Sequence, residues 1–158
     1  MPTIRQSVQV AQKLPAISAS GYEPIVIVGD YVTVAGVAAT DVIEMGILPA
    51  GYVPVDAILA ADDCDSNATP TITLDLGLMS GVAGVVDTAR TGGSEAFAAS
   101  TVAQAGGVAR MALAAFTQVA PMGADRGIGV RLAAGAATLV VGAKLRLTVI
   151  ARPALNGV

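Results

Sequence analysis

The chain has 158 residues, of which 54% are hydrophobic and 13% are charged, and its formal net charge is −3. This length fits one domain, because a chain of this size buries roughly 70% of the surface that its unfolded form exposes. The charged fraction lies below the roughly 25% that is typical of soluble domains, so much of the surface must be uncharged. Uncovered apolar patches usually mark protein contacts, so the composition favours association with other subunits. The alternative is a surface covered by small residues, Ser and Thr.

Nucleic acid and membrane are disfavoured as partners. Nine Lys and Arg stand singly along the chain and aromatic residues make up 3% of it, so it offers neither a basic stripe nor a stacking platform for nucleic acid. Charged residues interrupt the apolar runs before any reaches the 18 or so residues of a membrane span, as Asp30 does in the run 25–37. Residues 1–15 lack the apolar run of a signal peptide, which predicts folding in a cytosol.

In chain order, Ile4, Val8 and Val10 suggest an N-terminal strand. Apolar runs typical of strands then follow at 25–28 with 31–37, at 42–48 and at 52–59. Turn residues separate the runs at Gly29-Asp30, Pro49-Ala50-Gly51, Asp62–Pro70 and Gly92-Gly93. This spacing of strands and turns is typical of a sandwich or a barrel.

Period-two alternation is strongest at 71–78, where every second residue is a large aliphatic, as a strand with one buried face requires. The runs 127–132 and 144–149 alternate in the same way, and we expect them to pair as antiparallel neighbours. The side chains predicted to face the core are those of Ile72, Leu74, Leu76, Leu78, Ile128, Val130, Leu132, Leu145, Leu147 and Val149.

The Ala-rich segment 94–120 is ambiguous, because its apolar residues fit helical spacing and strand spacing alike. Such a long excursion in a small β domain is a candidate interaction arm, and the alternative is a loop that covers one end of the core. The sequence therefore predicts a mainly β fold, an antiparallel β-sandwich or jelly-roll-like barrel with one long loop or short helical excursion. One β-rich structural domain is expected over 1–158, with 1–12 and 94–120 as possible interaction arms.

Catalytic chemistry finds little support. The chain has no His, which removes Ser-His-Asp and Cys-His activation and the usual imidazole zinc sites. A Ser-Lys pair could use only Lys13 or Lys144, and neither stands at a supporting spacing. The glycine-rich segments 81–84 and 123–129 lack the full dinucleotide spacing and a strand-to-helix context. We expect no catalytic, cofactor-binding or metal residues, and no cofactor.

The acidic run Asp62–Asn67 is the one segment that invites a metal hypothesis. It fails as an EF-hand, because Ala68 stands in place of the turn glycine and Leu74 in place of the bidentate glutamate. An irregular calcium site remains open beside the expected role, a solvated turn in which Asp and Asn side chains cap backbone groups. Within the run, Cys64 has acidic neighbours that disfavour a thiolate, so a small partly buried side chain is expected.

Two stretches carry a family resemblance. The first runs from Thr40 to Ala57 and continues through Asp62–Ser66 into the 71–78 strand. The second is Asp125–Val130 followed by Gly142–Val149. Together they resemble small virion proteins encoded among the head genes of tailed bacteriophages, typically β-sandwich or jelly-roll-like subunits that decorate or cement a capsid or form head fibres.

The resemblance implies a structural protein of the virion without catalytic residues. The leading expectation is a decoration protein on the capsid surface, made in the host cytoplasm. Its expected partners are the major capsid protein and its own copies, with which it would form a homotrimer. The alternative is another virion component, such as a head fibre base, a tail-tube or connector subunit, or a minor capsid protein. A carbohydrate-binding sandwich is disfavoured, because its expected aromatic cluster is missing from the scattered Tyr22, Tyr31, Tyr52, Phe97 and Phe116.

Overall fold

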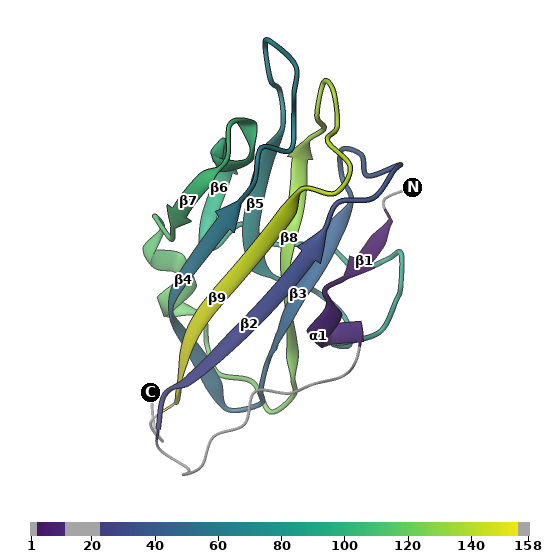
Figure 1. The fold of residues 1–158 in the computed structure, drawn as a ribbon. Helices are drawn as coiled ribbons and strands as arrows, with labels where there is room; N and C mark the ends of the chain where they lie inside the picture. The colour runs from purple at the N-terminus through teal and green to yellow at the C-terminus, as the bar shows by residue number, and fades with distance from the viewer. Residues whose placement is uncertain (1–2, 12–22, 155–158) are drawn as a thin grey trace.

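The computed structural model describes residues 3–11 and 23–154, and these residues form a β-sandwich of two sheets (Figure 1). The five-stranded sheet has the order β1 (Ile4–Gln6), β3 (Val42–Leu48), β8 (Arg126–Ala134), β5 (Thr73–Leu78) and β6 (Phe97–Ser100). The four-stranded sheet has the order β2 (Ile25–Val32), β9 (Lys144–Pro153), β4 (Tyr52–Ala61) and β7 (Gly107–Arg110). A short helix α1 (Val8–Ala11) and two 3-10 helices, η1 (Val102–Gln104) and η2 (Ala114–Gln118), complete the described elements. The predicted sandwich is confirmed, and its sheets do not close into a barrel.

The core lies between the two sheets, as the alternation predicts. Nine of the ten side chains expected to face inward are buried, and the tenth, Leu78, is partly buried against the same core. Leu74 and Leu76 from β5 meet Leu147 and Val149 from β9 in one apolar cluster. The period-two pattern therefore identified the buried face correctly.

The expected pairing of the two C-terminal runs is wrong. β8 pairs with β3 and β5, whereas β9 pairs with β2 and β4, so the two strands lie in different sheets. Both strands turn their large aliphatic side chains toward the core, and facing each other across the core satisfies that requirement as well as lying side by side does. Val130 of β8 and Leu147 of β9 accordingly belong to the same core cluster.

Two local predictions near the N-terminus also need correction. Gly29 and Asp30 are not a turn but lie inside the continuous strand β2, where a Cβ on Gly29 would collide with the carbonyl oxygen of Met45 in β3. The glycine therefore permits a close approach between the sheets. The N-terminal strand ends at Gln6, because Ser7 starts the helix α1: its Oγ accepts from the N–H of Val10 at 3.3 Å.

The ambiguous segment 94–120 supplies one edge strand to each sheet, β6 and β7, together with η1 and η2. Ala96, Ala103 and Phe116 from this segment are fully buried in the core. The segment thus crosses from one sheet to the other along one side of the sandwich. Among the described residues, no helix is long and apolar enough to cross a membrane.

Candidate assembly interface

The acidic turn ahead of β5 serves the fold through Asp65. This buried carboxylate accepts hydrogen bonds from the backbone N–H groups of Thr71, Ile72, Ala137 and Thr138, at 2.7 to 3.3 Å. Burial alone would raise the pKa of Asp65, but these bonds outweigh it and hold the pKa well below its usual range. The carboxylate thus ties the β4–β5 loop to the β8–β9 loop. Within the described ranges, no cluster of three His, Cys, Asp or Glu could hold a metal ion.

The other reactive groups singled out in the sequence do not meet. Cys64 is fully buried rather than partly buried, and burial, followed by the charges of Asp62 and Asp63, raises the pKa of its thiol to about 11. A thiol with this pKa stays protonated at neutral pH and is unsuited to nucleophilic chemistry. Lys144 lies exposed at the start of β9, where its backbone N–H donates to Asp62. Lys13 and Tyr22 lie outside the described residues.

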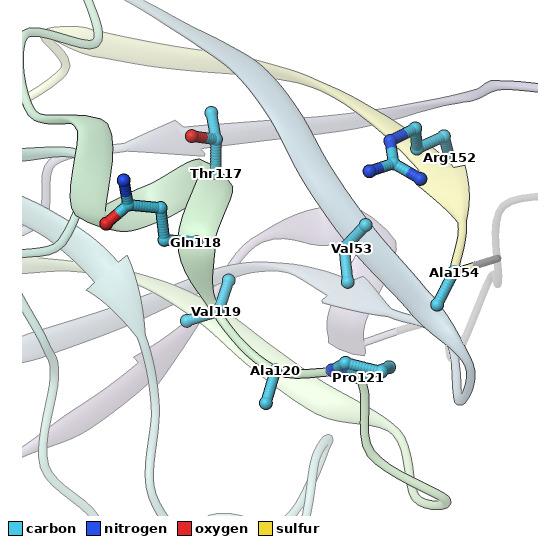
Figure 2. Close-up of a pocket in the computed structure, with 8 residues that line it drawn as sticks. All are labelled: Val53, Thr117, Gln118, Val119, Ala120, Pro121, Arg152 and Ala154. Carbon is cyan, nitrogen blue, oxygen red and sulfur yellow. The ribbon is translucent and has the colours of Figure 1, made fainter. Parts of the chain in front are cut away.

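A hollow of about 340 Å³ lies between η2, the segment after it and the ends of β4 and β9 (Figure 2). Its walls are mostly apolar or uncharged, and Arg152 is the one ionisable side chain among the eight residues that line it. The hydroxyl of Thr117 in its wall donates to the Ala114 carbonyl at 2.8 Å. The hollow thus presents one positively charged side chain, that of Arg152, in largely apolar surroundings, as a site of protein contact would.

This hollow adjoins the outward face of the four-stranded sheet, which we call the open face. Val53 and Arg152 are cross-strand partners, so the hollow lies where β4 begins and β9 ends (Figure 2). Three valines of β2 stand on the open face and expose 56%, 45% and 48% of their surface, and Val108 of β7 exposes 71%. The valines are Val26, Val28 and Val32. The valines of β2 thus line one edge of the open face and Val108 lies at the other edge, and exposed aliphatic side chains of this kind are typical of protein contacts.

The charges on the open face are mostly arginine paired with aspartate. Arg146 binds Asp30 at 3.2 Å, and Arg110 binds Asp56 at 2.7 Å. The hydrogen bond from Arg110 lowers the pKa of Asp56, against the opposing effect of burial. Within the part of the chain that the structure describes, Arg152 forms no ion pair and donates one hydrogen bond, to the Pro153 carbonyl at 3.3 Å. Arg152 therefore remains available to an acidic partner.

A second apolar surface lies on the opposite side of the sandwich. The segment 79–92, which we call the crossing loop, packs over the outer face of the five-stranded sheet. Glycines of β8 make room for it, since a Cβ on Gly129 would collide with Met79 and one on Gly127 with Glu44 and Arg90. The outer valines of the crossing loop expose 70%, 46% and 66% of their surface, namely Val82, Val85 and Val86.

A buried ion pair fixes the crossing loop to the sheet. Arg90 donates to both carboxylate oxygens of Glu44, at 2.7 and 2.8 Å, and the two side chains are 1% and 0% exposed. Arg90 also donates to the carbonyls of Ser80 and Val85 within the loop, at 2.9 and 2.8 Å. The exposed valines are thereby held in a fixed position, which reduces the entropy that a partner must remove on binding.

Neither apolar surface was located from the sequence, although one signal was present. Residues 25–28 are Ile-Val-Ile-Val, so β2 is apolar on both faces, whereas a strand with a solvated face should alternate with polar residues. Ile25 and Ile27 enter the core, and the two valines stand outside. The Glu44–Arg90 pair had no comparable signal, because 46 residues separate its members.

Comparison with solved structures places the chain among phage capsid proteins. A chain from the capsid of Ralstonia phage GP4 matches with a TM-score of 0.89 and 39% sequence identity, over 97% of this chain and 99% of that one. A chain from the cyanophage Pam1 capsid asymmetric unit matches with a TM-score of 0.64 and 26% identity, over 89% and 96%. No protein-family model matches the chain, and no curated protein matches it in sequence.

These matches define the chain as a structural protein of the phage virion. More particularly, the chain belongs to the same family as the GP4 capsid chain, with which it shares its fold over nearly the whole length of both. The predicted resemblance to phage virion proteins is confirmed at this level.

Proposed function

We propose that the protein is a capsid decoration protein that binds the outside of the phage head and stabilises it. It has no catalytic role. Its partners are the major capsid protein and its own copies, as a homotrimer at a local threefold position, and it is made in the host cytoplasm. Membership of a phage capsid family supports a place in the shell.

The observation that carries this proposal is the pair of apolar surfaces on opposite sides of a stiff sandwich. The open face presents Val26, Val28 and Val32, and the crossing loop presents Val82 and Val86. A subunit with one such surface could only attach, whereas a subunit with two can bridge two neighbours. Each bridge removes apolar area from water at roughly 25 cal/mol per Å², and symmetry repeats it over many copies.

The proposal is tested on particles with and without the protein, by measuring the temperature at which packaged DNA is released. Particles that carry the protein should release DNA at a higher temperature, because ligands that bind the assembled state stabilise it. Equal release temperatures, with absence of the protein from one sample verified, would leave a fibre base, connector or minor capsid component as the better assignment. The number of copies per particle separates these roles, since a shell decoration repeats with the lattice and a connector does not.

A further inference from the structure

We infer that the hollow at the end of the open face binds a segment of the major capsid protein in which a carboxylate side chain stands next to aliphatic ones, with Arg152 as the residue that selects it. This inference rests on the proposed function and deepens it, because it states which side of the subunit meets the shell. Arg152 and the apolar wall of the hollow, seen together in Figure 2, are the features that carry it.

The charge of the hollow points to an acidic group. Arg152 is exposed, and none of the other seven residues that line the hollow is ionisable. The remaining arginines of the open face are satisfied by aspartates of their own chain, Arg146 by Asp30 and Arg110 by Asp56. A planar guanidinium left with one weak carbonyl contact is suited to bidentate binding of a carboxylate from outside.

The walls of the hollow point to aliphatic neighbours of that carboxylate. Val53, Val119, Ala120, Pro121 and Ala154 provide the apolar lining, and Val53 is almost completely buried beneath it. A volume of about 340 Å³ admits one or two aliphatic side chains rather than a folded domain. The occupant is therefore a projecting segment that inserts, while flatter parts of the partner rest on the valines of the open face.

The size of the open face explains why such an anchor is needed. Strand spacing and rise give four strands of this length an area of about 400 Å². Specific interfaces usually bury about 800 Å² per partner, so the face alone would bind weakly. A side chain inserted beside Arg152 adds area and orientation together, and a few such anchored residues usually dominate the binding energy.

The test adds purified protein to particles prepared without it. The number of copies bound per particle is measured as a function of the concentration of free protein. Arg152→Gln should weaken binding at least tenfold and reduce its dependence on salt, because salt screens the lost ion pair. Lys144→Gln removes the same charge at the other end of β9, where Lys144 is exposed beside Val32 of the open face and forms no ion pair with a described carboxylate. It should weaken binding much less than Arg152→Gln does, because the acidic group is expected in the hollow and not at that end of the face.

A second variant keeps the test independent of Arg152. Ala120→Glu places a carboxylate in the hollow, where it competes for the guanidinium and repels an acidic segment, and should also weaken binding at least tenfold. Ala39→Glu, at another exposed alanine in the β2–β3 loop, should leave the affinity unchanged. Circular dichroism verifies that all four variants are folded.

The outcomes separate the inference from the function on which it rests. If the unmodified protein fails to bind the particles, the decoration role itself is wrong. If it binds and both hollow variants bind equally well, the role stands and the hollow is not the shell contact. If Arg152→Gln instead reduces self-association of the purified protein in sedimentation, the hollow holds a second copy of this chain, and the inference is overturned in favour of that partner.

Discussion

Glu44 and Arg90 form a fully buried bidentate ion pair on the outer side of the five-stranded sheet, although 46 residues separate them in the sequence. Glu44 belongs to β3, and Arg90 belongs to the crossing loop. Glu44 also accepts from the backbone N–H of Gly84 at 3.1 Å, so the carboxylate holds the loop at two points. The pair connects the fold to the proposed interface, because the valines of the crossing loop are positioned by it.

Removing one partner of this pair should be strongly destabilising. Arg90→Ala leaves the Glu44 carboxylate buried without its counter-ion, which costs about 3–5 kcal/mol in comparable sites. Urea unfolding followed by circular dichroism measures the loss. The double variant Glu44→Leu with Arg90→Met should recover much of it, since an apolar pair avoids the unpaired charge. A loss below about 1 kcal/mol for Arg90→Ala would contradict the buried geometry.

Acid should weaken the fold through Asp65. The pKa of this carboxyl is depressed in the folded protein, so the unfolded chain binds its proton more readily. The stability that Asp65 contributes is therefore fully present above the unfolded pKa, near 4, and is lost as the pH falls toward the lower folded pKa. Melting temperatures from pH 7 to pH 2 measure this. Asp65→Asn should lower the melting temperature at pH 7 and flatten its decline below pH 4. An unchanged decline would assign the acid sensitivity to other carboxylates.

The buried positions identified by alternation should be costly to truncate. Leu76→Ala and Leu147→Ala each remove side-chain atoms from fully buried sites. Each should lower the free energy of unfolding by about 2–5 kcal/mol, because transfer free energy is lost and a cavity remains. Val55→Ala is the comparison, because Val55 is 40% exposed and its truncation should change the unfolding free energy by under about 1 kcal/mol. Similar losses at all three positions would mean that burial does not govern their contribution.

Strand positions and burial could be predicted from the sequence because alternation is local. The residues of β3 were expected at 42–48, as found, and the inward faces of β5, β8 and β9 followed from period two. Pairing could not be predicted in the same way. Alternation states which face of β8 or β9 is buried, but it does not state which strand lies alongside, and that choice is fixed by contacts far apart in the chain.

Glycine and alanine account for the remaining errors. Gly29-Asp30 has the composition of a turn, yet both residues lie within β2. The glycine is needed there because the Met45 carbonyl approaches too closely for a side chain. β6 (Phe-Ala-Ala-Ser) and β7 (Gly-Val-Ala-Arg) have four residues each, which is too short for a usable alternation. The hollow beside Arg152 was beyond sequence reasoning, since it is formed by cross-strand partners in β4 and β9 together with the segment after η2.

Charge placed on the crossing loop should separate attachment from bridging. Val82 and Val86 are 70% and 66% exposed, so Val82→Asp with Val86→Asp should leave the fold and its melting temperature nearly unchanged. Because the loop lies on the side opposite the open face, the variant should still attach to particles through the hollow. It should lose the second contact, since carboxylates in an apolar interface must be desolvated without a partner.

The measurement compares two quantities on the same particles, the number of bound copies and the temperature of DNA release. The valine-to-aspartate double variant should saturate its binding sites on the particles at a moderately higher protein concentration. It should raise the temperature of DNA release less than the unmodified protein does. Val141→Asp, at a valine that is 61% exposed in the β8–β9 loop, is the control and should preserve both quantities. If the double variant raises the release temperature fully, the crossing loop makes no contact that stabilises the shell, and bridging must use another part of the surface.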